Sequence, residues 1–147
     1  GLDGLATTVT IIVLIFLFLV SFISGNVDAG IFAFFLVGAL MAFLFFNINP
    51  AKVFMGDTGS LALGGAIAGI AFVLGIELVL IVAGIIYVIE TLSVIIQVVV
   101  FKLTKKRVFK MAPIHHHFEH LGWSENKIVY VFGAITLFAC IISFLML

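Results

Sequence analysis

The chain has 147 residues, of which 65% are hydrophobic and 10% are charged, and its mean hydropathy is +1.44. Soluble domains contain about 45–50% apolar and about 25% charged residues, so this composition excludes an ordinary soluble protein and indicates an integral membrane protein. The formal net charge is zero. A nucleic-acid-binding protein needs a dense basic face on a soluble module, and this sequence has none, which excludes nucleic acid as a partner.

Five apolar segments are each long enough to cross a bilayer, which takes about 20 mainly apolar residues in a helix. We therefore expect an all-α integral membrane protein. Its single transmembrane domain covers residues 1–147, with spans at about 5–24, 29–46, 60–76, 78–101 and 127–147. The linkers GNVDAG and GIE are so short that the first two spans, and the third and fourth, must be antiparallel hairpins.

Successive spans cross the membrane in opposite directions. The start of the chain and two loops, 47–59 and 102–126, therefore lie on one side of the membrane. All seven Lys and Arg residues lie on that side, six of them between Lys102 and Lys127. The positive-inside bias makes this side cytoplasmic. The polar segments on it are the candidates for a functional site.

The segment NPAKVFMGDTGS, residues 49–60, precedes the third apolar run. Asp57, between Gly56 and Gly59, has two interpretations: an ordinary helix cap, or a ligand of Mg²⁺ beside a phosphate that the helix N-terminus favours. The opening GLDGLA repeats the pattern, with Asp3 between glycines at the start of the first span. Taken by itself, Asp3 is explained by helix capping. If Asp3 and Asp57 point into one shared cleft, a single ligand site explains both.

The segment MAPIHHHFEHLGW, residues 111–123, contains three consecutive histidines. Neighbours on a helix are turned about 100° apart, so the three cannot all face one point on a helix; after Pro113 we expect an extended or turn segment in which alternate histidines converge. Beside the basic residues of this loop, imidazoles suit an anionic ligand such as a diphosphate. A zinc site and a basic loop on anionic lipid headgroups are the alternatives.

In the fourth apolar run, Glu90 and Gln97 lie on one helix face, because seven residues make about two turns, or 10.5 Å along the axis. Gln97 lies near the cytoplasmic boundary, where it can reach a ligand. Glu90 lies deeper in the membrane, where a carboxylate is costly. We expect Glu90 to be structural, either hydrogen-bonded to neighbouring helices or protonated.

These segments, together with YVIETLSVIIQV, closely resemble the bacterial phospho-N-acetylmuramoyl-pentapeptide transferase (MraY) family, which belongs to the superfamily of polyprenyl-phosphate sugar-1-phosphate transferases. The resemblance runs in order over the whole chain. It implies Mg²⁺-dependent transfer of phospho-MurNAc-pentapeptide from UDP-MurNAc-pentapeptide to undecaprenyl phosphate. The reaction releases UMP and forms lipid I on the cytoplasmic face of the bacterial inner membrane, for peptidoglycan synthesis. The resemblance also suggests a homodimer.

Roles for individual residues follow from the resemblance by motif position. Asp57 is implied to bind Mg²⁺ and to be needed for catalysis, and Phe54 to stack on uracil. The three histidines, His115, His116 and His117, are implied to be catalytic and to line the place where the diphosphate and sugar lie. The remaining nucleotide and substrate contacts are assigned to the start of the chain and to two amide side chains, namely Gly1, Leu2, Asp3, Asn47 and Gln97.

The family has about ten membrane helices and an Asp-Asp motif in its first half, and this sequence contains no Asp-Asp pair. We expect the chain to be the C-terminal half of the ten-helix fold, with the missing N-terminal half as its partner and no turnover by itself. Two other classes stay open. One is a transporter half or lipid-binding scaffold, and the other is an intramembrane aspartyl protease, which needs a second aspartate facing the first.

Overall fold

The computed structural model describes residues 2–147, so the predicted contact of Gly1 lies outside the described residues. The described residues form seven helices and no strand: α1 (Leu5–Ile23), α2 (Val27–Asn47), α3 (Gly56–Leu74), α4 (Glu77–Ala83), α5 (Ile85–Thr104), α6 (Ile114–Glu119) and α7 (Glu125–Leu145). Five of them, all except α4 and α6, are long and apolar enough to cross a membrane. The predicted all-α membrane fold is confirmed.

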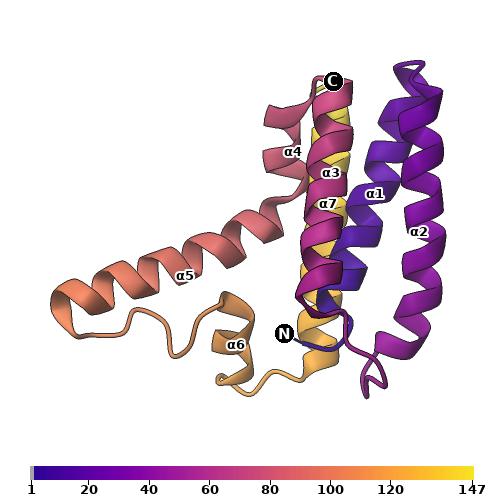
Figure 1. Cartoon of the computed structure of the whole chain (residues 1–147). Coiled ribbons are helices and arrows are strands. Elements are labelled where there is room, and N and C mark those ends of the chain that lie inside the picture. The colour runs from indigo at the N-terminus through magenta and orange to yellow at the C-terminus, as the bar shows by residue number, and fades with distance from the viewer. Residues whose placement is uncertain (1) are drawn as a thin grey trace.

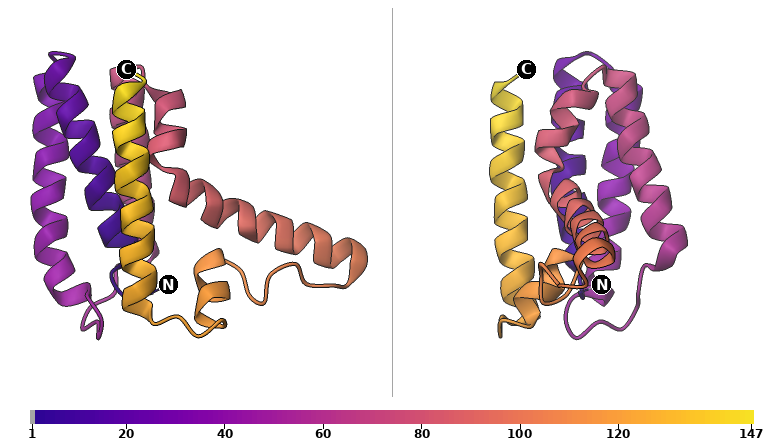
Figure 2. Two further views of the ribbon diagram at one scale, coloured as in Figure 1. Left: turned by 180° about the vertical axis from the view of Figure 1, so that it is seen from behind. Right: turned by 90° about the vertical axis from the view of Figure 1, so that its left-hand side faces the viewer.

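Helix α1 packs against α2, α3 and α7 and is the most enclosed of the spans (Figure 1). The α1–α2 turn, the α3–α4 turn and the C-terminus lie at one end of the bundle. The N-terminus, the loop after α2 and α6 lie at the other end, and the two further views agree (Figure 2). The polar segments therefore share one end of the molecule.

Two threonines on α1 bond to other elements. Thr7 Oγ1 donates to Asn47 Oδ1 at 2.7 Å, and Asn47 Nδ2 donates to Val53 O at 2.9 Å. One turn further along α1, Thr10 Oγ1 lies 2.7 Å from the Tyr87 hydroxyl of α5. Polar groups inside an apolar bundle need partners within the protein, because hydrocarbon supplies none. These contacts fix the end of α2 and the start of α5 against α1.

The fourth predicted span, 78–101, is wrong as a single helix. The chain breaks at Gly84 into α4, which packs on α7, and α5, which runs outward from the bundle (Figures 1 and 2). A Cβ at Gly84 would lie 3.0 Å from Leu80 O and 3.1 Å from a Tyr87 ring carbon, so only glycine fits the break comfortably. Most residues of α5 are consequently exposed.

We predict that Thr7→Val lowers the free energy of unfolding by about 1–3 kcal/mol, because it leaves the buried Asn47 oxygen without a donor. Thr136→Val is the matched control: Thr136 is equally buried, but its hydroxyl donates only to Phe132 O of its own helix. Denaturant unfolding of the purified protein in micelles measures both. Equal losses for the two variants would contradict the role given to the Thr7–Asn47 bond.

Candidate functional site

Asp3 holds the segment after α2 against the start of α1. Its Oδ2 accepts from the backbone N–H of Ala51 at 2.9 Å and from Asn49 Nδ2 at 3.3 Å. The same Asn49 nitrogen also donates to Glu125 Oε2 of α7 at 3.1 Å. Helix α1 begins after Gly4 without a side-chain cap, so the capping interpretation of Asp3 is wrong. The carboxylate instead joins three elements at one end of the bundle.

Asp57 lies in the first turn of α3 with an exposed side chain. The helix begins at Gly56, four residues before the predicted span, and the preceding Met55 makes no side-chain cap. Asp57 is therefore not the cap of α3, and its carboxylate faces the solvent beside a helix N-terminus. Backbone N–H groups and the helix dipole at such a terminus favour phosphate, and the carboxylate is a hard oxygen donor.

Phe54 and Asn47 belong to the same connection but have opposite environments. The Phe54 side chain is 70% exposed, whereas Asn47 is 7% exposed and uses both ends of its amide on Thr7 and Val53. An exposed ring next to Asp57 is free to stack on a flat ligand. Asn47 supports the loop that carries this ring, and its predicted contact with the nucleotide stays a prediction.

The three histidines lie in helix α6, which corrects the expectation of an extended segment after Pro113. The His115 and His116 rings lie beside each other, with centroids 4.2 Å apart. The three nitrogens still reach different partners, because each successive residue of a helix is turned by about 100°. His115 Nδ1 lies 2.8 Å from Glu90 Oε2, His116 contacts Glu119 within α6, and His117 Nδ1 accepts from the backbone N–H of Lys110 at 3.0 Å. His115 is buried, while the other two are half-buried.

Glu90 therefore bonds to the loop helix α6, and not to a neighbouring membrane helix as expected. The sequence placed Glu90 in the membrane but gave no signal for its partner, 25 residues further on. Asn49 and Glu125 were also not predicted as site residues. The sequence did place both on the same membrane face as Asp3, and this position could have identified them.

Gln97 anchors the basic loop to α5. Its Oε1 accepts from the backbone N–H groups of Val108 and Phe109 at 3.1 and 2.9 Å, and its Nε2 donates to Phe109 O at 3.0 Å. The oxygen is fully used by these bonds, and one of the two N–H groups on Nε2 donates to the loop. The structure thus gives Gln97 a positioning role in the loop, and its predicted contact with the nucleotide stays a prediction.

Leu2 connects the start of the chain to the histidine helix. It is buried in an apolar cluster with Leu5 and Ile128, against which Ile114, Phe118 and Trp123 pack. Because Ile114 and Phe118 flank the three histidines, this cluster holds α6 beside the N-terminus. The polar end of the molecule is thus assembled from the start of α1, the loop before α3, and α6.

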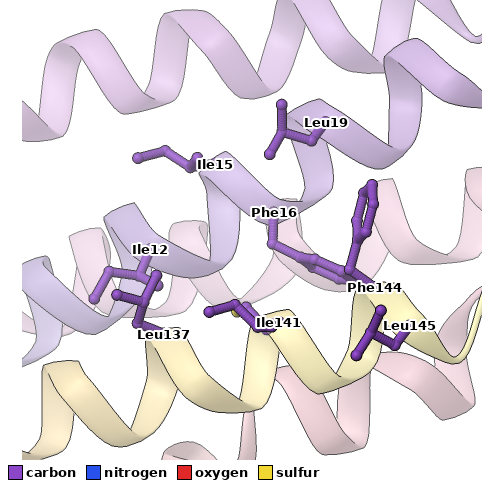
Figure 3. Close-up of a pocket in the computed structure, with 9 residues that line it drawn as sticks. Ile12, Ile15, Phe16, Leu19, Leu137, Ile141, Phe144 and Leu145 are labelled. Carbon is purple, nitrogen blue, oxygen red and sulfur yellow. The ribbon is translucent and has the colours of Figure 1, made fainter.

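Two cavities differ in what they can bind. A groove of about 320 Å³ between α1 and α7 is lined by aliphatic and aromatic side chains, with the Cys140 sulfur as its one heteroatom among the side chains drawn (Figure 3). It offers nothing to a phosphate. A second cavity, of about 440 Å³, lies between α1, α3 and α5 and includes Thr10, Ser60 and Tyr87. Ser60 is one helical turn from Asp57, so this cavity adjoins the polar end.

Within residues 2–147, no three His, Cys, Asp or Glu side chains come together as a metal site. This finding gives no support to the zinc interpretation of the histidines. Mg²⁺ differs, because proteins commonly bind it through one or two carboxylates while substrate phosphates and water complete the shell. The exposed carboxylate of Asp57 fits as one such ligand.

The fold and site define a multi-pass membrane protein whose polar groups gather at one end. Residues 1–76 match the family model described as glycosyl transferase family 4, and the chain belongs to this family. It is 64% identical over 144 residues to the phospho-N-acetylmuramoyl-pentapeptide-transferase of Clostridium perfringens (strain 13 / Type A), covering 98% of this chain and 45% of that protein.

Two further relatives carry the same name. The protein of Clostridium botulinum (strain Eklund 17B / Type B) is 63% identical, and that of Clostridium kluyveri (strain NBRC 12016) is 57% identical, each over 147 residues and the whole of this chain. The chain covers 45% and 46% of these proteins. It therefore spans about 45% of the length of the curated relatives it matches.

We predict that Gln97→Ala releases the loop from α5, because three hydrogen bonds are lost together. Hydrogen–deuterium exchange in the purified protein will then rise at residues 105–112. Thr91→Ala is the control, since the Thr91 hydroxyl donates only to Tyr87 O of its own helix. Unchanged exchange at Val108 and Phe109 in Gln97→Ala would show that other contacts hold the loop.

Proposed function

We propose that the complete protein carrying this chain transfers phospho-MurNAc-pentapeptide from UDP-MurNAc-pentapeptide to undecaprenyl phosphate, releasing UMP. The observation that carries the proposal is the 57–64% identity to proteins named phospho-N-acetylmuramoyl-pentapeptide-transferase. The clustering of Asp3, Asp57 and the histidine helix at one end of a membrane bundle supports it. In the reaction, a lipid phosphate oxygen bonds to the β-phosphorus of the UDP-sugar, and the bond from that phosphorus to the bridging oxygen breaks.

The residues of this chain serve such a reaction by binding and positioning. Phosphoryl transfer depends mainly on alignment and on neutralisation of the charge on the phosphate oxygens. The N-terminus of α3 presents backbone N–H groups to an anion, and the exposed Phe54 ring offers a stacking surface for uracil. Asp57 would hold Mg²⁺, and the ion, when bound, would supply charge neutralisation at the diphosphate.

Partners and location follow from the same proposal. Undecaprenyl phosphate reaches the site from the bilayer, and the nucleotide reaches it from the cytoplasm, so a site at the basic end of the bundle serves both. We place that end at the cytoplasmic face of the bacterial inner membrane, because all seven Lys and Arg residues lie in the segments at that end. We further propose that turnover requires the N-terminal part present in the longer relatives, and that the enzyme is a homodimer.

The rival classes lack comparable support. An aspartyl protease needs two aspartates that share a proton, and the Asp3 carboxylate is bonded to Ala51 and Asn49. Asp28, the third aspartate, lies in the first turn of α2, at the opposite end of the bundle. A transporter half or lipid-binding scaffold gives no reason for the identity to named transferases.

For activity tests we define the complete transferase as a full-length relative that carries this chain in place of its matching segment. We predict that Asp57→Asn lowers kcat/KM by about 100-fold or more, because a neutral amide cannot replace the carboxylate as a metal ligand. Release of UMP measures the rate. Asp28→Asn, the same change in the first turn of α2, is the matched control and keeps near-normal turnover. Near-normal turnover of Asp57→Asn would refute the assignment.

We predict that Phe54→Ala in the complete transferase weakens UMP binding by about 1–3 kcal/mol, the usual contribution of an aromatic ring stacked on a base. Because the ring is exposed, the melting temperature changes little. Phe45→Ala, at an 81% exposed Phe in α2, is the control. Isothermal titration calorimetry measures the affinity, and equal Kd values for wild type and Phe54→Ala would remove the stacking role.

A further inference from the structure

Glu90 is a carboxylic acid in α5, one of the helices long and apolar enough to cross a membrane, and its side chain is 19% exposed. Ionisable groups at such depth are rare and usually serve function. Its Oε2 lies 2.8 Å from His115 Nδ1, while Oε1 is buried with no hydrogen-bond partner among residues 2–147. The Glu90–His115 contact is thus the one hydrogen bond that the described structure gives this carboxylate.

The contact favours one tautomer of the histidine ring. An ionised carboxylate only accepts, so it favours the tautomer with the proton on Nδ1, and in a neutral ring this tautomer leaves a lone pair on Nε2. The His115 side chain is 10% exposed, and its Nε2 is buried with no partner within the part of the chain that the structure describes. Buried polar atoms in native proteins almost always have partners, so this nitrogen calls for one.

Ser93 fixes the same helix without touching the ring. Its Oγ accepts from the backbone N–H of Ile114 at 3.0 Å and donates to Glu90 O at 2.7 Å. Ser93 therefore holds the backbone at the start of α6, whereas Glu90 holds the imidazole itself. Substitution of Ser93 therefore tests the docking of α6, and substitution of Glu90 tests the orientation of the His115 ring.

We propose that Glu90 is a positioning residue, which holds His115 in the tautomer with the proton on Nδ1 and keeps Nε2 as an acceptor for a hydroxyl or amide N–H group of the sugar-bearing substrate. This inference rests on the proposed function. The same logic operates wherever a buried carboxylate orients a functional imidazole and fixes its tautomer. Glu90→Gln preserves the shape of the side chain but can present N–H to Nδ1, which favours the opposite tautomer.

In the complete transferase, we expect Glu90→Gln to raise KM for UDP-MurNAc-pentapeptide about tenfold or more, with kcat within about threefold of wild type. Ser93→Ala loses a tether of α6 but not the ring contact, so its KM stays near wild type. If Glu90 acted only in folding, the active fraction and hence the apparent kcat would fall while KM stayed constant. That result, or a KM rise of equal size in Ser93→Ala, would overturn the proposal.

A double-mutant cycle tests whether Glu90 acts through His115. In a His115→Gln background, Glu90→Gln should change KM by less than about twofold, because the ring that it orients is gone. An equal rise of KM in both backgrounds would show that Glu90 acts elsewhere.

A spectroscopic readout is independent of turnover. Solid-state NMR of the complete transferase with ¹⁵N-labelled histidine, assigned by difference from His115→Gln, should show His115 protonated on Nδ1 in wild type and shifted toward Nε2 protonation in Glu90→Gln. Identical ring signals in the two proteins would refute the positioning role. A wild-type protein that releases no UMP but shows the expected ring signals would instead contradict the proposed function alone.

Discussion

The polar groups along α1 are the constraint on which the rest of the structure depends. Thr7 and Thr10 lie one turn apart on α1, and Asp3 lies just before its start; each bonds to a different part of the chain: the end of α2, Tyr87 of α5, and the Ala51 segment, respectively. In an apolar bundle, such bonds have no competing partners in the hydrocarbon. They fix the rotation of α1, and that rotation determines where the loop before α3 and the start of α5 lie.

The sequence predicted the broad architecture because hydropathy and charge are sums over many residues. Spans of about 20 apolar residues and the basic loops on one side are robust to local detail. The break at Gly84 depends instead on one glycine, at which a Cβ would meet Leu80 O and the Tyr87 ring. Glycines are common in membrane helices, so their presence alone does not mark a break.

The site was predicted less completely, because its geometry depends on pairs far apart in sequence. Asp57 was found from local composition and Phe54 only through the resemblance to the transferase family, and both are exposed as a ligand site requires. The partnership of Glu90 with His115 and the bridge of Asn49 between Asp3 and Glu125 join residues 25 to 76 positions apart. No spacing rule links such residues, and only packing brings them together. The histidines lie in a helix, and not in the predicted extended segment, because α6 packs Ile114 and Phe118 against Leu2 and α7.

The two turns opposite the basic loops also affect how the protein is made. The α1–α2 turn and the α3–α4 turn are short, and neither they nor the residues just beyond them contain Lys or Arg. With the basic loops on the cytoplasmic side, as we propose, little polar material has to cross the hydrocarbon during insertion. Helices α1 and α2 can enter the bilayer together as a preformed pair, and the contact between them is local in sequence. Assembly then reduces to docking a few such units, which limits the search that the nascent chain must make.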